Sequence, residues 1–171
     1  MKISRLLLVC VALAPVMAGC GFAPLYANRG KPGTSAQADL NATKIATIPD
    51  RSGQMLRNEL IDRMNVGGEP RAPVYELKVK LRESEEKLLV RKDEVATAAN
   101  LTLFADYQLT EIASGKVLTS GTARVLTRYD VLRAQYGTIA AEQDARSRGV
   151  GQLAEDIRTR VGIYFNSARG R

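Results

Sequence analysis

Two parts of the sequence have side chains that can react or bind. Cys20 follows two small residues near the N-terminus, and a thiol at such a place is open to covalent modification. Lys87, Arg91 and Lys92 lie close together in the middle of the chain. Arginine and lysine are the side chains that bind phosphates, arginine as a bidentate fork and lysine as a point charge. The candidate chemistry is therefore modification at Cys20 and anion binding at the cations.

The segment before Cys20 has the layout of a secretory signal peptide, with Lys2 and Arg5 ahead of an apolar run. That run is shorter than the roughly 20 residues that span a bilayer as a helix, so we expect residues 1–19 to be removed. Residues 17–20, Met-Ala-Gly-Cys, resemble the bacterial lipobox, although Met17 departs from the usual leucine. The resemblance implies lipidation of Cys20 and a stable membrane anchor. The alternative is a secreted protein with a chance cysteine.

Composition limits the remaining functions. Loss of Lys2 and Arg5 with the leader leaves 23 Lys and Arg against 18 Asp and Glu, a net charge of +5. The mature chain would have no thiol for a disulfide, and the sequence has no histidine, the commonest general base and metal ligand. It has no catalytic pair, no metal-ligand spacing and no nucleotide motif. We expect no enzyme, no cofactor, no metal and no nucleic-acid partner.

Apolar periodicity predicts six main elements. They are a short strand at 43–49, a helix capped by Asp50 or Ser52 and ending near Asn65, strands at 75–82, 95–112 and 116–129, and a helix at 139–165. The order is β-α-β-β-β-α. It predicts an α+β fold, a two-layer sandwich in which two helices cover one face of a four-stranded sheet.

Alternation along the strands assigns the two faces of that sheet. The helix-covered face is predicted to hold a mostly apolar set with small residues near the helices: Leu101, Leu103, Ala105, Tyr107, Leu109, Val117, Thr119, Gly121, Ala123 and Val125. The other face is predicted to be polar: Glu76, Lys78, Lys80, Arg82, Thr102, Asp106, Gln108, Thr110, Ser120, Thr122 and Arg124. Such a face is suited to water or to a wet partner wall.

Three further patterns have a functional and a structural interpretation. Glu83, Glu85 and Glu86 are either paired acids or a solvated edge, and we favour the edge. Gly149 and Gly151 interrupt a helical pattern, which points to close packing on the sheet and not to a phosphate loop. The cations near 87–92 either bind an anionic glycolipid or are charged because a hairpin tip is solvated.

The expected organisation has four parts: a signal peptide at 1–19, a lipidated N-terminus and flexible tether at 20–40, one domain at 41–168, and a tail at 169–171 that frays with its neighbours from Ser167 on. Phe22, Leu25 and Tyr26 are too apolar for a free linker, so we expect them to dock on a surface.

Residues 20–26, Cys-Gly-Phe-Ala-Pro-Leu-Tyr, resemble the start of the lipopolysaccharide-assembly lipoprotein family LptE. The stretch 129–157, with Tyr136, Glu-Gln-Asp-Ala at 142–145 and Leu-Ala-Glu-Asp-Ile at 153–157, is also similar to that family. The resemblance implies a non-enzymatic lipoprotein on the periplasmic side of the outer membrane. It would plug and help assemble the LptD β-barrel while lipopolysaccharide passes to the outer leaflet. Its lipopolysaccharide contact would fall on Arg91, with Lys92 and Lys87 beside it.

Two other classes remain open. An accessory lipoprotein of a phospholipid-transport system would need a roomy apolar pocket, whereas the small residues predict a thin core. A cell-wall hydrolase would need catalytic groups that the sequence lacks. Co-purification with a large barrel would distinguish an LptE-like lipoprotein from the accessory lipoprotein of a phospholipid-transport system.

Overall fold

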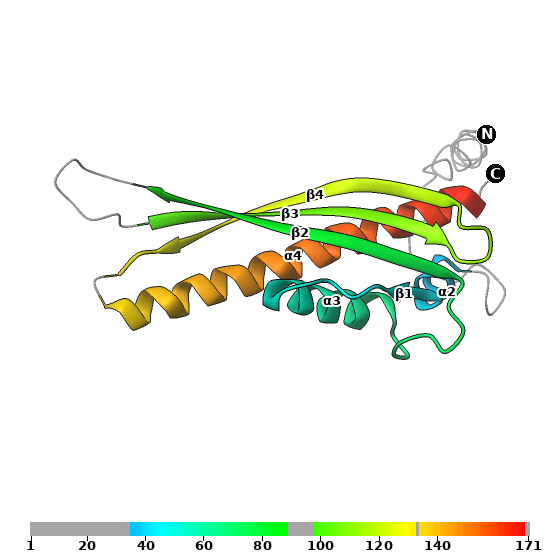
Figure 1. Ribbon diagram of the computed structural model, residues 1–171, viewed down its shortest axis with the longest axis horizontal. Coiled ribbons are helices and arrows are strands. Elements are labelled where there is room, and N and C mark those ends of the chain that lie inside the picture. The colour runs from blue at the N-terminus through cyan, green and yellow to red at the C-terminus, as the bar shows by residue number, and fades with distance from the viewer. Residues whose placement is uncertain (1–34, 89–97, 133, 170–171) are drawn as a thin grey trace, which may run out of the picture.

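The computed structural model describes residues 35–88, 98–132 and 134–169. Figure 1 shows an elongated molecule in which three long strands lie over a long C-terminal helix. The elements are α2 (Ala36–Asn41), β1 (Thr43–Ile45), α3 (Arg51–Met64), β2 (Tyr75–Leu88), β3 (Ala98–Glu111), β4 (Val117–Asp130) and α4 (Gln135–Arg169). The predicted α+β sandwich and its β-α-β-β-β-α order are confirmed, with the short helix α2 placed before them.

The sheet has the order β1-β2-β3-β4. β1 runs parallel to β2 and pairs only with Tyr75–Leu77, whereas β2, β3 and β4 form a long antiparallel meander. A parallel pair needs a crossover, and α3 supplies it. Gly115 turns the chain between β3 and β4 with φ +66°, a conformation that glycine adopts without steric cost.

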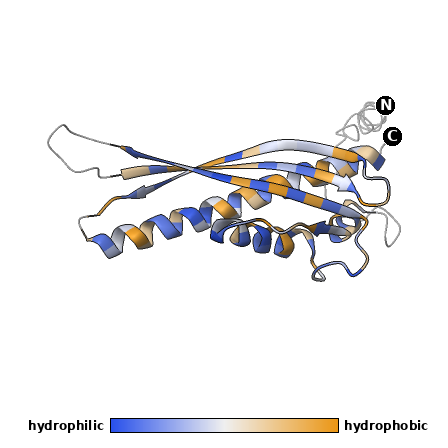
Figure 2. Ribbon diagram, in the orientation of Figure 1, coloured by the Kyte–Doolittle hydropathy of each residue, from blue (hydrophilic) through white to orange (hydrophobic). Residues whose placement is uncertain are grey.

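Helices α3 and α4 cover one face of the sheet (Figure 1). Hydrophobic and hydrophilic residues alternate along the strands, as Figure 2 shows, so each strand has one face for the core and one for solvent. The predicted helix stripe is confirmed, because Leu56, Leu60 and Met64 are fully buried. α4 contributes Val150, Leu153 and Ile157 to the same core, which the sheet completes with Leu77, Leu101, Leu103, Ala105, Leu109 and Ala123.

One predicted core residue is wrong. Val117 is 46% exposed, because the β3–β4 register shifts between Leu109 and Thr110. Leu109 pairs with Thr119 and Thr110 pairs with Val117, so one residue of β4 is skipped. A bulge of this kind turns the following side chain to the other face. Leu118 packs partly against the core instead.

Helical structure begins at Ala36, inside the segment 20–40 that we expected to be a flexible tether. Ser35 caps α2, its Oγ accepting a hydrogen bond from the backbone N–H of Ala38. Ala36 and Leu40 are buried in the core. Two apolar side chains four residues apart on a single turn were too short a pattern to predict a helix.

α4 is longer at both ends than predicted. It begins at Gln135 and continues to Arg169, past Ser167, where we expected fraying. A salt bridge of 2.6 Å between Arg169 and Asp39 joins the last turn of α4 to α2. The pairing joins the two ends of the described chain at the same end of the molecule (Figure 1).

Candidate functional site

The predicted anion-binding residues are only partly within the described chain. Cys20, Arg91 and Lys92 lie outside the described residues. Lys87 is exposed near the end of β2 that is far from α2 (Figure 1). It shares a row with Ala99 of β3 and Tyr129 of β4, both buried, so it lies on the side of the sheet that the helices cover.

The acidic residues of β2 make structural contacts. Glu83 accepts a hydrogen bond from Arg146 Nε at 3.1 Å, and Arg146 Nη2 reaches Glu142 at 2.6 Å. This bridge ties β2 to α4 beside the first turns of α3, whose Arg51, Ser52 and Met55 line the same hollow as Glu83 and Arg146. Glu85 hydrogen-bonds to the hydroxyl of Tyr129. The three acids are exposed, as expected of a solvated edge, but Glu83 and Glu85 also make contacts with Arg146 and Tyr129 that the sequence did not predict.

Tyr129 is only 6% exposed. Its burial, together with the hydrogen bond to the Glu85 carboxylate, raises the pKa of Tyr129 to about 12. The folded state therefore holds this proton at pH values where the unfolded chain, with an ordinary tyrosine pKa near 10, has released it. Stability from this group is complete below about pH 10 and is lost as pH rises through about 12.

We expect Tyr129→Phe to flatten the alkaline loss of stability. Urea unfolding at pH 9 and pH 11.5 is expected to show a fall in the free energy of unfolding that is about 1–2 kcal/mol larger in the wild type than in the variant. Tyr136→Phe is the control, because Tyr136 is 89% exposed and is expected to keep the wild-type profile. Parallel profiles for wild type and Tyr129→Phe would show that Tyr129 titrates normally.

The uncovered sheet face has a row of two arginines around one aromatic ring. Arg82 of β2, Phe104 of β3 and Arg124 of β4 are direct cross-strand neighbours. The guanidinium carbons lie 5.6 Å (Arg82) and 5.4 Å (Arg124) from the ring centroid. Both distances are within the range of cation–π attraction. The register therefore places two cations at the sides of one phenyl ring.

The next row along the face is polar and hydrogen-bonded. Asp106 accepts a hydrogen bond from Thr122 Oγ1 at 2.7 Å and from Arg82 Nη2 at 2.8 Å. The bonds from Thr122 and Arg82 hold the pKa of the Asp106 carboxyl below its usual range. Asp106 thus stays ionised and connects the arginine row to the polar row.

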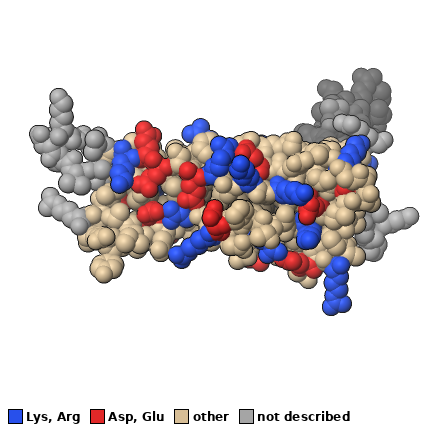
Figure 3. All heavy atoms as spheres, in the orientation of Figure 1, with Lys and Arg blue, Asp and Glu red and all other residues tan. Residues whose placement is uncertain are grey.

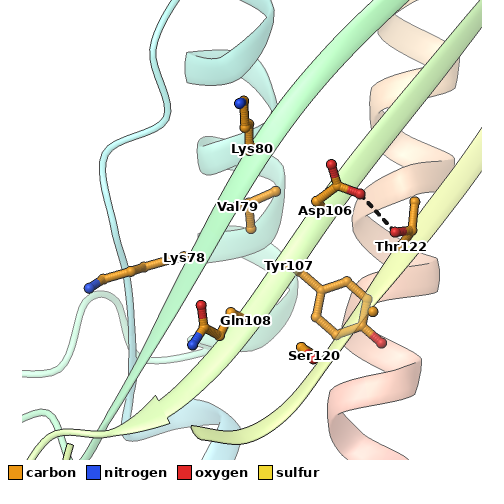
Figure 4. A pocket seen from close by; sticks show the side chains of 9 residues that line it. Lys78, Val79, Lys80, Asp106, Tyr107, Gln108, Ser120 and Thr122 are labelled. Carbon is orange, nitrogen blue, oxygen red and sulfur yellow. Dashed lines mark hydrogen bonds between the residues drawn. The ribbon is translucent and has the colours of Figure 1, made fainter.

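A shallow hollow of about 470 Å³ lies beside Asp106 on this face. Figure 4 shows its lining side chains, which come from all three long strands. Lys78, Lys80, Gln108, Ser120 and Thr122 supply donors and acceptors to it. The small residues of β4 leave the space open, so the hollow is a place for a polar ligand or a polar partner surface.

In the view of Figure 3, Lys and Arg lie among Asp and Glu along the length of the molecule. The charges on this side are mixed, so they produce no extended field of one sign. The described residues contain no group of three or more His, Cys, Asp and Glu placed to hold a metal. No helix within 35–88, 98–132 or 134–169 is long and apolar enough to cross a membrane.

The sequence analysis assigned the uncovered face but missed Phe104. The signal was present, because position 104 falls between Thr102 and Asp106 on the polar face, where an aromatic residue is unusual. Its arginine neighbours depend on the register of β2 with β3 and of β3 with β4. The sequence between β2 and β3 contains no glycine, proline or asparagine that would fix the first of these pairings.

Solved structures share the fold. A putative lipoprotein from Caulobacter crescentus has a TM-score of 0.64 and 22% identity, covering 77% of this chain and 96% of that one. Uncharacterized lipoprotein B from Nitrosomonas europaea has a TM-score of 0.56 and 15% identity, covering 72% and 83%. A minor lipoprotein from Acinetobacter baumannii has a TM-score of 0.51 and 14% identity, covering 71% and 91%.

Family membership comes from the sequence itself. No curated protein matches the chain. The family model described as "LptE: Lipopolysaccharide-assembly" matches residues 39–161, which is more than half of the chain and includes every strand of the sheet. The chain belongs to the LptE family of lipopolysaccharide-assembly lipoproteins.

Proposed function

We propose that the protein is an outer-membrane lipoprotein, anchored on the periplasmic side through lipidated Cys20, that plugs an LptD-like β-barrel and helps it assemble. Lipopolysaccharide passes to the outer leaflet through the same complex. Arg91, Lys92 and Lys87 contact it. The role is structural and non-enzymatic, in keeping with the assembly function of the family.

The main support from the structure is the sheet face that both helices leave open. It is polar along most of its length, and the lumen of a large outer-membrane barrel is polar and wet. A face of this kind can line a water-filled wall without burying unpaired apolar surface. The opposite face is already filled by α3 and α4, so it has no comparable surface to offer.

The length of the domain also supports this arrangement. α4 has 35 residues, and a helix of that size is about 50 Å long. The apolar band of an outer-membrane barrel is about 25 Å tall. A domain aligned with the barrel axis would therefore extend beyond the wall. The 15 residues from Cys20 to 34 reach at most about 50 Å, enough for a lipid in the inner leaflet to hold the α2 end at the barrel mouth.

The proposal predicts the outcome of an affinity purification. Tagged full-length protein from detergent-solubilised outer membranes is expected to recover one large β-barrel in stoichiometric amount, identified by mass spectrometry. The Cys20→Ala variant is expected to leave the membrane fraction but still to recover the barrel when overproduced, because the contacts come from the folded domain.

Two results would contradict the proposal. If Cys20→Ala folds normally, as judged by circular dichroism, yet recovers no barrel, the domain is not a plug. If the wild type recovers an inner-membrane transporter with its substrate-binding partner, the function moves to phospholipid transport.

A further inference from the structure

We propose that the uncovered sheet face has its own binding site for a phosphorylated saccharide headgroup, formed by the Arg82–Phe104–Arg124 row with Lys80 beside it. This inference rests on the proposed function, which brings a phosphate-bearing glycolipid to the domain. It places a contact near the middle of the sheet, on the opposite face from Lys87.

The first argument is the availability of the cations. Arg124 and Lys80 are exposed, and within the described chain neither has an ion-pair partner. Arg82 pairs with Asp106, but its side chain is still 55% exposed. Three cations therefore face one carboxylate, Asp106, and an excess of positive charge remains for a ligand. The exposed guanidinium groups can donate paired hydrogen bonds to the oxygens of a phosphate group.

The second argument is that the two guanidinium groups are held in place. An exposed arginine normally moves among many rotamers, and ordering it on binding costs conformational entropy. Phe104 lowers that cost, because both Arg82 and Arg124 already lie against its ring. Each such contact is an electrostatic attraction between the guanidinium and the face of the ring. The ring thus presents two phosphate-binding forks at a fixed spacing set by three adjacent strands.

The third argument is the adjoining hollow, which distinguishes a saccharide from a bare anion. It begins at Asp106 and Lys80, next to the arginine row. Gln108, Ser120 and Thr122 line the rest of it (Figure 4). Sugar hydroxyls both donate and accept hydrogen bonds, and these side chains do the same. A phosphate on the arginines with its sugar in the hollow would satisfy both parts of the site.

The test measures lipopolysaccharide binding by purified full-length protein in detergent. Arg82→Gln/Arg124→Gln is expected to bind at least tenfold more weakly than the wild type. Lipopolysaccharide whose phosphates have been removed is expected to bind the wild type at least as weakly as intact lipopolysaccharide binds the variant, because it also loses its phosphate contacts with Arg91, Lys92 and Lys87. The matched control is Lys116→Gln/Arg128→Gln, which removes the same charge from exposed positions away from the row, and its affinity is expected to stay within threefold of wild type.

Several outcomes would overturn the inference. Equal losses in the two double variants would show a general charge effect, and unchanged affinity in Arg82→Gln/Arg124→Gln would remove the row from the site. Competition by inorganic phosphate as effective as that by lipopolysaccharide would show an anion site without a saccharide part. Thermal unfolding must show that both double variants fold. Lys80→Gln, which removes no contact with an aromatic ring, is a milder second variant and is also expected to bind lipopolysaccharide more weakly than the wild type.

Barrel recovery separates this inference from the proposed function. If Arg82→Gln/Arg124→Gln loses the barrel and keeps its lipopolysaccharide affinity, the row is a protein contact and the inference is wrong, while the plug remains. If the wild type recovers the barrel but binds no lipopolysaccharide, the inference fails together with the proposed lipopolysaccharide contact at Arg91, Lys92 and Lys87, while the plug remains. If no barrel is recovered yet the row binds phosphorylated lipopolysaccharide, the proposed function fails and the site stands.

Discussion

Substitution of Gly149 by valine is expected to lower the free energy of unfolding by about 3 kcal/mol, the upper part of the range for overpacked cores. A Cβ atom at Gly149 would lie 2.6 Å from Leu103 Cδ1 and 3.3 Å from Thr127 Cγ2. Leu103 is fully buried and Thr127 is 7% exposed, so neither side chain has free space to move into. α4 would have to move away from β3 and β4, its main contacts with the sheet.

The control lies two residues further along α4, at Gly151. A Cβ there meets only Arg63 Nη2, at 3.5 Å, which is an ordinary contact. Gly151→Ala is expected to stabilise the protein by up to about 1 kcal/mol, because alanine has the higher helix propensity. Urea unfolding of the two variants measures both effects. A Gly149→Val variant as stable as wild type would mean that α4 does not pack on the sheet at this distance.

This pair of glycines shows what a helical pattern can and cannot predict. Both interrupt the helix in the same way, and we expected close packing on the sheet to explain both. The structure gives that reason to Gly149 alone. Periodicity places a residue on a helix face to within part of a turn, but the distance to the opposing backbone depends on which side chain lies across from it.

The sheet was predictable because its signals were repeated. Four alternations in β2 and five in β3 assign each residue to a face, and one deviation does not change the result. The prediction that Val117 lies on the helix-covered face was wrong because a single bulge reverses the alternation there, and no glycine or proline marks the bulge in the sequence. α2 was missed for the opposite reason, since one helical turn is too short to show a period.

The candidate site was less predictable than the fold. The sequence analysis placed anion binding at Lys87, Arg91 and Lys92 because they are neighbours in the chain. The Arg82–Phe104–Arg124 row joins residues from three strands, more than 40 positions apart at the extremes, and only the register brings them together. Short-range clusters are visible in a sequence, whereas cross-strand clusters require the pairing to be known.

The loop that follows α3 is fixed by one amide. Asn65 is 3% exposed, and its Nδ2 donates to the backbone carbonyls of Leu40 at 3.0 Å and Thr43 at 3.1 Å. These bonds join the end of α3 to α2 and to β1. The acceptors are buried backbone groups, and a buried oxygen left without a partner costs about 1–3 kcal/mol. The Leu40 carbonyl also accepts from the N–H of Ala42, so the larger part of this cost is expected at Thr43.

Asn65→Asp is therefore expected to destabilise the protein by about 3 kcal/mol at pH 8, because it replaces the donor with a carboxylate that faces carbonyl oxygens. Burial would raise the folded-state pKa of the introduced acid above its unfolded value near 4. The folded state then binds more protons, so stability is expected to return as pH falls through the raised pKa, by up to about 1.4 kcal/mol per pH unit.

Asn41→Asp is the matched control. Asn41 Oδ1 already accepts hydrogen bonds from Gln37 and from the N–H of Val66, and a carboxylate can accept the same bonds. Urea unfolding at pH 5, 6.5 and 8 measures both variants. If Asn65→Asp were as stable as Asn41→Asp at pH 8, the amide would not join α3 to α2 and β1.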